Sequence, residues 1–528
     1  MQKEEKMTNK KIVGIDLGTT FSAIAVLDDI GKPEVLPDIK TNNRITPSAV
    51  YLASDPNKSA VGTEALAASK AEPARVITEM KTRMRDNNEV VYSVDEAKWI
   101  ERKFEDKKEN EFSPAQLSSM ILEKLKGFSE NIDKAVITVP AMFAQRAREA
   151  TRDAAKIAGL SGYSGEAVDL INEPEAAILH YASLEGSSVN GKVMVFDLGG
   201  GTFDVSIANV TGKKVKFIHS EGNPNLGGKD FDRALLEYLS DEYNNQLGAK
   251  LNLDDIEYLQ QAEELKKVLS ARESHGTIID GPNGPSKTIE VTRDKFNDII
   301  SRFIDETSMK IRSCLKKSNL KPEDITQTLL VGGSTRISAV VDSITKIMGK
   351  PPTKGVNVDE AVAAGAAIYA GLNAPKDELN AAQVQSISEV DLESVANYFF
   401  GTFAVIIDQE QGIAEQVNTT VIKRGTKVPC AQTQKYTVLN PEGFDASITQ
   451  SEDETKNSKF VIVLHNEIVK LNNAKEGDEI LVTYSYDKNQ MMHCRFECGT
   501  EKYEIDIKPK SSETVEQAKE QIKNFKIE

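Results

Sequence analysis

The sequence predicts an α/β protein made of two similar halves and followed by an all-β module. The tripeptide Asp-Leu-Gly occurs twice, starting at Asp16 and at Asp197, each time at the end of a short apolar run. Short strands and helical segments alternate after both copies, whereas beyond residue 397 the helical periodicity disappears and only short strand-like segments remain. A motif repeated about 180 residues apart predicts two similar halves, and this prediction takes precedence over local detail.

Each Asp-Leu-Gly copy is expected to form a phosphate-binding turn between two strands. The first strand covers residues 11–15 in one copy and 192–196 in the other, and each strand stops at the Asp. Glycine leaves room for a ligand close to the backbone, and consecutive turn amides form an anion-binding nest. The Asp attracts the Mg²⁺ that accompanies a nucleotide phosphate. A single hairpin of this kind is usually a plain turn, but two copies indicate two halves that face one nucleotide.

Length and composition predict a large acidic protein of three or four structural units. Its 528 residues carry 65 Lys and Arg against 81 Asp and Glu, and the net charge of −16 disfavours nucleic acid as a main ligand. Residues 1–11 are polar, and no apolar run approaches the roughly 20 residues of a membrane helix, so we expect a cytoplasmic protein without a membrane partner. Four cysteines make no disulfide framework, and Cys494 and Cys498 alternate with polar residues as core-facing thiols of one strand.

The first half continues from its hairpin into residues 34–106, where the signals are mixed, and then into alternating helices and strands. Pro174 is placed as the first residue of an Ala-rich helix at the end of this series. The apolar spacing before it predicts helices at 113–129 and 147–158 and strands at 134–139 and 167–171.

The second half repeats this plan with longer insertions. Helical spacing covers 230–271, a β-rich insertion covers 277–292, and helix resumes to about residue 317. The strand 328–331 then opens onto Gly332-Gly333-Ser334, just before a helix face at 337–347. A helix that begins after such a turn presents free amides and a positive dipole end, which favours an anion or a ribose.

Two runs of small residues are predicted to bring helices of the two halves together. Residues 359–368 are nearly all small, and Ala176 and Ala177 lie in the earlier Ala-rich helix. Small side chains let helix backbones approach closely, so these helices are placed to cross and hinge where the halves meet. A buried Ala-rich helix without a hinge role fits the same residues, because Ala has the highest helix propensity.

The last part of the chain is predicted to hold a linker, the β module and a terminal helix. Residues 375–397 lose periodicity and turn polar and acidic, which is typical of a linker. Residues 511–528 are expected to form a polar helix, from about Ser512 to Phe525. The β module is expected at 398–510, with strands at 399–407, 436–439, 460–464, 480–486, 492–498 and 503–507.

Seven strings between residues 12 and 372 resemble, in order, those of the 70-kilodalton heat-shock chaperones. This resemblance implies an actin-like ATPase with two lobes, each built on a ribonuclease H-like sheet, that binds ATP or ADP in the cleft between them. Lobe I would cover 1–187 and lobe II 188–374, with 359–372 packing back at the lobe interface. The strings are Gly14-Ile-Asp-Leu-Gly-Thr-Thr20, Ala135-Val-Ile-Thr-Val-Pro-Ala141, Ile171-Asn-Glu-Pro174, Phe196-Asp-Leu-Gly-Gly-Gly-Thr-Phe-Asp204, Leu226-Gly-Gly-Lys-Asp-Phe-Asp232, Val331-Gly-Gly-Ser-Thr-Arg336 and Asp359-Glu-Ala-Val-Ala363.

The resemblance also implies roles for the cleft residues. Asp16 and Asp197 would orient Mg²⁺ through its waters, and Asp204 would help to coordinate a monovalent cation such as K⁺. No histidine falls in any motif, so catalysis would rest on placement and electrostatics. The catalytic set would be Lys81, which matches the family's catalytic lysine, Glu173 and Thr202, which would position the attacking water, and Asp197.

Nucleotide binding is implied for two groups of residues. Without the resemblance, Lys266 and Lys267 would be interpreted as part of a solvated helix face. The phosphate group is Gly18, Thr19, Thr20, Phe21, Gly199, Gly200, Gly201 and Thr202. The nucleoside group is Gly228, Lys266, Lys267, Ser270, Gly332, Gly333, Ser334, Arg336 and Asp359.

Several features depart from the family pattern. The β module resembles the family's peptide-binding sandwich. The acidic run 387–393 stands where the family has a hydrophobic linker, so it stays open whether the lobes are coupled to this module. The long helical lid is reduced at most to the tail helix. Asp169 stands where the family has an Arg used by J-domain partners, and the reversed charge would repel their acidic docking motif. Customary residues are also replaced at Phe21, Met142, Glu175 and Lys229.

These features predict an ATP-dependent, chaperone-like protein that binds Mg-ATP, hydrolyses it slowly and couples lobe closure to a polypeptide client. A nucleotide-exchange factor is a further implied partner. A J-domain co-chaperone is disfavoured by the charge of Asp169. Two alternatives stay open on the same scaffold. A small-molecule kinase would transfer phosphate to an added alcohol, and a nucleotide-dependent filament or scaffold protein would sediment with ATP.

Overall fold

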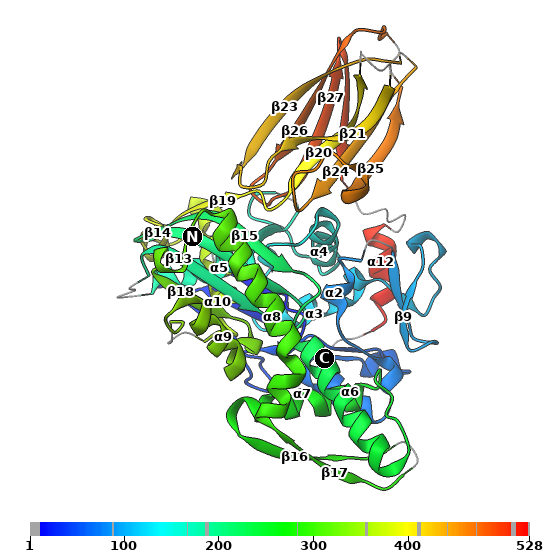
Figure 1. Cartoon of the computed structure of the whole chain (residues 1–528), viewed down its shortest axis with the longest axis vertical. Helices are drawn as coiled ribbons and strands as arrows, with labels where there is room; N and C mark the ends of the chain where they lie inside the picture. Colours follow the sequence, from blue (N-terminus) through cyan, green and yellow to red (C-terminus); the bar gives the residue numbers. More distant parts are fainter. Residues whose placement is uncertain are drawn as a thin grey trace, which may run out of the picture.

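Figure 1 shows two mixed α/β lobes with a separate all-β module above them. The computed structural model describes residues 11–86, 89–165, 167–184, 189–281, 284–353, 357–408, 413–440, 442–470, 473–507 and 514–525. The α/β class with a following all-β module is confirmed. The expected lobe boundary at residues 187 and 188 lies outside the described residues.

Lobe I, up to residue 184, is built on a mixed sheet that carries the first hairpin. β1 (Ile12–Asp16) and β2 (Phe21–Leu27) form this antiparallel hairpin. On the β1 side, β11 (Val136–Val139) and then β12 (Asp169–Asn172) add in parallel. On the β2 side, β3 (Pro33–Val35) adds antiparallel, so the order is β12-β11-β1-β2-β3.

The sheet of lobe II repeats this arrangement. β13 (Gly191–Leu198) and β14 (Phe203–Thr211) form the second hairpin. β18 (Gln327–Val331) joins β13 in parallel, and β15 (Lys214–Asn223) joins β14 antiparallel. The order β18-β13-β14-β15 therefore matches β11-β1-β2-β3 strand for strand. The sequence repeat corresponds to a repeated strand topology, with both turns at the same end of equivalent strands.

Helices cover the sheets close to the predicted positions, with one break that the sequence analysis missed. The predicted helical section 230–271 is two helices, α6 (Gly228–Leu247) and α7 (Ile256–Ala271), because Gly248 ends α6 in the left-handed conformation at φ +71°. The other long helices are α3 (Pro114–Lys126), α4 (Gln145–Ile157), α5 (Glu173–Ser183), α8 (Arg293–Lys317), α9 (Ser338–Met348) and α10 (Ala361–Asn373).

Short elements complete the lobes. The predicted β-rich insertion is a hairpin of β16 (Ser274–Ile279) and β17 (Lys287–Thr292), which projects from lobe II in Figure 1. The mixed stretch after the first hairpin folds as β4 (Thr46–Pro47), β5 (Val50–Tyr51), β6 (Ala60–Val61), α1 (Thr63–Ala67), β7 (Val76–Ile77), α2 (Met80–Arg83), β8 (Val90–Ser93), β9 (Lys98–Glu101) and β10 (Glu111–Phe112).

The two small-residue helices cross as predicted. A Cβ atom on Gly365 of α10 would lie 1.7 Å from the Ala176 carbonyl oxygen of α5, so the helix backbones are in direct contact. A Cβ atom on Gly14 of β1 would lie 2.1 Å from the Ala367 nitrogen of α10. α10, which follows the lobe II strands in the chain, therefore packs back against lobe I.

Residues 375–397, the predicted linker, contain a helix and a strand that pack on the lobes. α11 (Ala381–Ile387) packs on lobe I, where the Gln383 amide donates a hydrogen bond of 2.9 Å to the Leu27 carbonyl. β19 (Asp391–Val395) then adds in parallel to the edge of the lobe II sheet at β15.

The segment 375–397 can pack on the lobes despite its acidic composition because a carboxylate in it forms ion pairs. Glu393 of β19 pairs with Lys216 of lobe II at 2.7 Å and also with Lys427 of the β module. Val390 and Leu392, the alternating apolar residues, pack against the core between the lobes. β22 (Lys427–Val428) pairs with β19, so the β module is joined directly to the lobe II sheet.

The β module consists of two four-stranded sheets, β21-β20-β24-β25 and β23-β26-β27-β28, which share one core. Cys494 and Cys498 are buried in that core as free thiols, as predicted. β21 and β24 were not among the expected strands because much of their length is polar, including buried Thr449 and Gln450. The strands are β20 (Phe399–Asp408), β21 (Ile413–Ile422), β23 (Cys430–Thr437), β24 (Phe444–Ser451), β25 (Ile462–Val469), β26 (Glu479–Tyr486), β27 (Met492–Cys498) and β28 (Glu501–Asp506).

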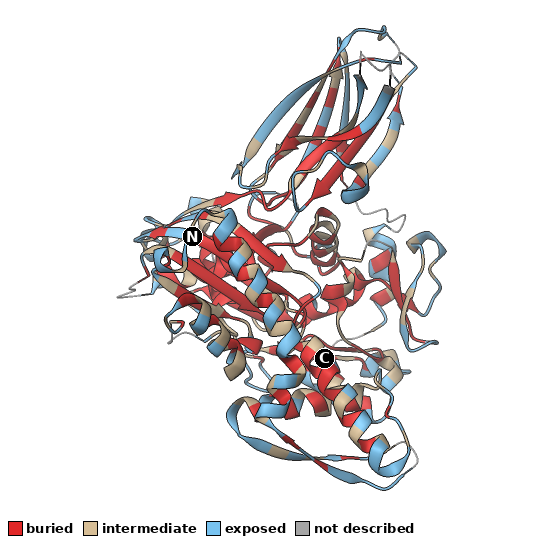
Figure 2. Cartoon of the chain, viewed as in Figure 1, coloured by how far each residue is buried: buried red, intermediate tan, exposed pale blue. Residues whose placement is uncertain are grey.

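The terminal helix α12 (Val515–Ile522), which the sequence analysis gave as the most that remains of a lid, packs on lobe I. Ala518 and Ile522 belong to the lobe I core, and the Phe525 ring lies edge-on to Phe112 at 5.7 Å. The Gln116 amide of α3 donates to the Ala518 carbonyl at 3.3 Å. Figure 1 shows α12 beside α2 and β9, away from the sandwich, and Figure 2 shows buried residues concentrated in the lobe sheets and the sandwich interior.

Candidate nucleotide-binding and catalytic site

A cavity of about 420 Å³ lies between the lobes and is lined by both hairpin turns. Gly201, Gly228 and Asp204 are the predicted site residues outside this lining. The predicted residues that do line it are Asp16, Gly18, Thr19, Thr20, Phe21, Lys81, Glu173, Asp197, Gly199, Gly200, Thr202, Lys266, Lys267, Ser270, Gly332, Gly333, Ser334, Arg336 and Asp359. The structure therefore brings together predicted residues from seven separate parts of the chain.

The two hairpin turns face each other closely enough that their glycines are required. A Cβ atom on Gly200 would lie 1.9 Å from the Thr20 hydroxyl oxygen of lobe I. A Cβ atom on Gly201 would lie 2.7 Å from the Thr82 methyl and 2.8 Å from the Thr19 methyl. Any side chain at either glycine would push the lobes apart at the point where phosphate is expected.

Lys81 enters the cavity from α2 and is buried there. Its ammonium forms an ion pair with the carboxylate of Glu173, the first residue of α5, and lies 5.9 Å from the centre of the Phe143 ring. Glu173 is itself buried, so the pair is shielded from bulk water. A lysine in this place can supply positive charge to a developing phosphoryl group.

Acidic side chains are crowded on one side of the cavity. Burial, and then the charge of Glu173, raise the pKa of Asp16 to about 7 and the pKa of Asp204 to about 7. The same two causes raise the pKa of Asp197 well above its ordinary value. This excess of negative charge is what a bound cation would relieve.

The donor set fits a cation that keeps most of its own waters. Within the described ranges, no three His, Cys, Asp or Glu side chains come close enough to hold a metal ion among themselves. Asp16 and Asp197, one from each lobe, suit Mg²⁺, which binds through few carboxylates together with water and phosphate oxygens. Asp204 lies behind the turn, where its carboxylate accepts the Ala141 amide at 3.1 Å.

The nucleoside side of the cavity is lined by α7 and by the turn after β18. Lys266 is buried and pairs with Asp232 at 2.7 Å, so the solvated-face interpretation is wrong for this lysine. The Lys267 ammonium lies across the cleft over the Phe21 ring, 5.7 Å from its centre. Arg336 forms an ion pair of 2.6 Å with Asp359. Predicted binding residues are thus held in place by their neighbours.

The model of the family described as Hsp70 protein matches residues 12–526 of this chain. The chain belongs to the Hsp70 family. The match extends beyond the motifs of the lobes to the β module and α12. Hsp70 proteins are ATPases and ATP-dependent chaperones, with a two-lobed actin-like ATPase and a β-sandwich, and they bind ATP or ADP with Mg²⁺. Among the described helices, none combines the length and apolarity that a membrane crossing requires.

Asp169, whose charge was expected to repel a J-domain partner, lies in the interior of this Hsp70 protein. Asp169 begins β12 and is fully buried. Its carboxylate accepts the backbone amides of Tyr163 at 2.7 Å and Ser164 at 3.1 Å. The charge stabilises the loop before the strand and is not presented to a partner.

Two contacts at the phosphate turn were missed by the sequence analysis. The Arg85 guanidinium donates a hydrogen bond of 3.1 Å to the Gly201 carbonyl, and Lys229 pairs with Glu79 at 3.0 Å. Neither Arg85 nor Glu79 lies in a motif. The one available signal was Lys229, which departs from the usual family residue inside a motif.

Proposed function

We propose that this Hsp70 protein binds Mg-ATP in the cleft, hydrolyses it slowly, and couples its nucleotide state to the binding of a polypeptide client. The observation that carries the proposal is the single cavity lined by both phosphate turns, with Lys81 and Glu173 buried at its wall. In a loose phosphoryl-transfer transition state, catalysis depends mainly on positioning and charge. That requirement matches a cavity whose described lining contains lysine, carboxylates and turn amides and no histidine.

Each cleft residue has a defined task in this proposal. The Lys81 ammonium and the amides of the turn after β13 stabilise negative charge on the transferring group. Glu173 and Thr202 hold the attacking water, and Asp16 and Asp197 hold the hydrated cation. A Mg²⁺ ion held by these two carboxylates would supply positive charge that neutralises part of the phosphate charge.

Contacts between the cleft and the β module support coupling. The loop at residues 141 and 142 donates its Ala141 amide to Asp204 at the cleft. The carbonyl of Ala141 accepts from the Asn397 amide group at 2.8 Å, and that of Met142 accepts from the Tyr398 hydroxyl at 2.6 Å. One loop therefore contacts the Asp204 carboxylate next to the phosphate turn as well as residues 397 and 398, where the β module begins.

Exposed apolar side chains on the β module support binding of an extended client. β25 is an edge strand, and Ile468 on it is 78% exposed. Phe460 just before β25 is 73% exposed, and Val405, Ile406 and Ile407 of β20 are also exposed. Apolar side chains beside a free strand edge favour strand addition with side-chain pockets.

Hydrolysis is tested by single-turnover measurements with Mg-ATP and no phosphate acceptor. We expect phosphate release by the wild type, loss of most of it in Lys81→Met and Asp197→Ala, and weaker Mg-ATP binding in Asp197→Ala. Lys435→Met is the matched control, because Lys435 forms a Lys-Glu pair of 3.1 Å on the β module. Near-normal turnover in both cleft variants would refute the assignment. Phosphate that appears only on an added sugar or alcohol would favour the kinase alternative, and sedimentation induced by ATP would favour a filament.

Coupling is tested by titrating an apolar fluorescent peptide with the protein in ATP and then in ADP. A difference in affinity between the two states supports coupling through β19 and the loop at residues 141 and 142. An unchanged affinity shows that the nucleotide does not control the β module.

A further inference from the structure

The segment that carries Lys81 contacts the phosphate turn of lobe II and the start of α6 through two residues that lie outside the family motifs, Arg85 and Glu79. Arg85, just after α2, donates from its guanidinium to the Gly201 carbonyl at 3.1 Å. Glu79, just before α2, pairs with Lys229 at 3.0 Å. Arg85 and Glu79 belong to lobe I and both partners to lobe II. The two contacts therefore cross the cleft on either side of Lys81.

Lys229 is connected to the phosphate turn by its backbone as well. It is the second residue of α6, and its amide donates to the Gly200 carbonyl at 2.8 Å. The preceding amide, of Gly228, donates to the Gly199 carbonyl at 2.9 Å. A displacement of Lys229 would therefore also displace the Gly199-Gly200 backbone of the phosphate turn.

Glu79 adopts a backbone conformation that is uncommon for its residue type. Its φ is +68°, in the left-handed region, although it is neither Gly nor Asn. Such a conformation persists when surrounding contacts determine it, and it is often found at functional sites. The charge of Lys229 is the main cause that lowers the pKa of Glu79, which agrees with a persistent ion pair.

We propose that Arg85 and the Glu79-Lys229 pair are positioning residues that hold the lobe II phosphate turn against the Lys81 segment. In this role they set how fast the cleft opens to release nucleotide and how well Lys81 is aligned for hydrolysis. The inference rests on the proposed ATPase function, because it concerns the same cleft.

The two contacts are expected to differ in their response to salt. The side chains of Lys229 and Glu79 are 23% and 32% exposed, so added salt screens their attraction. The hydrogen bond from Arg85 ends on an uncharged carbonyl, and this bond is screened less. Salt dependence therefore separates the ion pair from a general packing role.

The test measures release of fluorescent ADP by stopped flow, and hydrolysis in a single turnover. For Lys229→Met and Glu79→Gln we expect release to become about threefold faster, the size expected for a partly exposed pair. The double variant should show no further gain, because each change removes the same interaction. For Arg85→Met we expect hydrolysis to slow about tenfold with ATP affinity nearly unchanged, and Arg85→Lys should recover part of the rate. Lys435→Met is the control.

Salt provides the second readout. Between about 0.05 M and about 0.5 M salt, release from the wild type should approach the rate of Lys229→Met, while the Lys435→Met control follows the wild type throughout. Release and hydrolysis equal to the wild type in all cleft variants would overturn the inference. Additive effects of Lys229→Met and Glu79→Gln would overturn it as well. A wild type that neither retains nucleotide nor hydrolyses it refutes the proposed function itself, and the inference falls with it before any variant is compared.

Discussion

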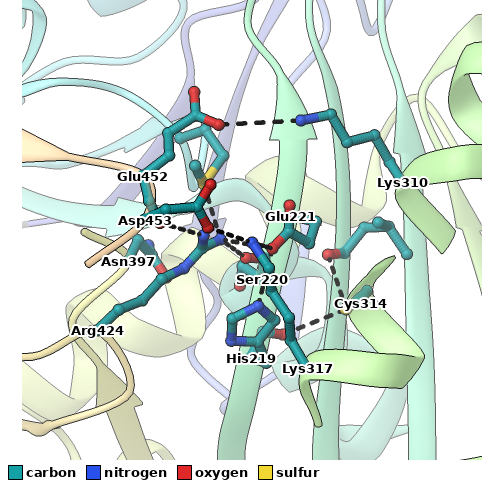
Figure 3. Close-up of polar contacts among 12 residues, drawn as sticks. His219, Ser220, Glu221, Lys310, Cys314, Lys317, Asn397, Arg424, Glu452 and Asp453 are labelled. Carbon is teal, nitrogen blue, oxygen red and sulfur yellow. Dashed lines mark hydrogen bonds and ion pairs between the residues drawn. The ribbon is translucent and has the colours of Figure 1, made fainter. Parts of the chain in front are cut away.

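The guanidinium of Arg424 in the β module lies 3.3 Å from the carboxylate of Glu221 in lobe II, and both side chains are 3% exposed. Arg424 precedes β22, and Glu221 lies in β15. Lys317 of α8 pairs with the same carboxylate at 3.0 Å and with Asp453 of the β module at 2.9 Å. Figure 3 shows these side chains converging on Glu221 from both parts of the molecule. A charge network with a buried Arg424-Glu221 pair at its centre therefore joins the β module to lobe II.

Replacing Arg424 by methionine should loosen this junction. The change leaves the Glu221 carboxylate buried, with Lys317 and His219 as its remaining partners among the described residues. We expect docking to weaken by about 2 kcal/mol, less than for a buried charge left alone, because Lys317 remains. Hydrogen exchange of the β19 amides reports undocking directly. Lys427→Met is the control, since Lys427 is 65% exposed, and equal effects of the two changes would contradict this view of the junction.

The junction should also weaken in acid. Burial alone would raise the pKa of Glu221, but the hydrogen bond from His219 and the charges of Arg424 and Lys317 outweigh it and lower the pKa to about 2. The folded-state pKa is therefore below the ordinary value of 4.5. The ionised carboxylate stabilises the folded, docked state above that ordinary value, and this contribution is lost as pH falls towards the folded-state pKa. The difference in stability between wild type and Glu221→Gln should shrink from about pH 5 to about pH 2.5, and a constant difference would rule out this role.

Changes in α12 should affect lobe I and leave peptide release unaltered. Ile522 is 7% exposed within the lobe I core, so Ile522→Asp buries a charge without a partner. We expect lobe I to lose about 3 kcal/mol of stability, seen as a lower melting temperature, with an unchanged dissociation rate of bound peptide. Asn524→Asp adds the same charge at an exposed position of the tail and should be neutral. Faster peptide release at an unchanged melting temperature would instead support a lid.

The crossing of α5 and α10 should not tolerate even one added methyl group. In Gly365→Ala the new atom would lie 1.7 Å from the Ala176 carbonyl oxygen, so the two helices must separate. We expect a loss of about 3 kcal/mol in stability together with weaker nucleotide binding. Gly165→Ala is the control, because nothing lies within 4 Å of the added atom. Thermal unfolding with and without ATP measures both effects, and normal stability of Gly365→Ala would show that the helices can move apart freely.

Much of the fold could be predicted because its signals are local. The hairpins at Asp16 and Asp197, the helix after Ser113 and the β module are visible as short periodic runs. β19, β21 and β24 were missed because their residues look polar or acidic in isolation. They form strands because neighbouring strands pair with their backbones and because charged side chains have partners, as Glu393 has in Lys216 and Lys427. The break at Gly248 was missed because the helical spacing continues on both sides of it.

By itself, the sequence determined which residues are candidates for the cleft. Each predicted phosphate turn, with the carboxylate at its start, is encoded within a few consecutive residues, so it can be recognised without knowing what lies opposite. Only the tertiary structure decided how the parts are held together. The contacts of Arg85 with Gly201, Glu79 with Lys229 and Arg424 with Glu221 join segments far apart in the chain. Such contacts depend on how the lobes and the β module are oriented relative to one another. A local sequence pattern does not predict this orientation.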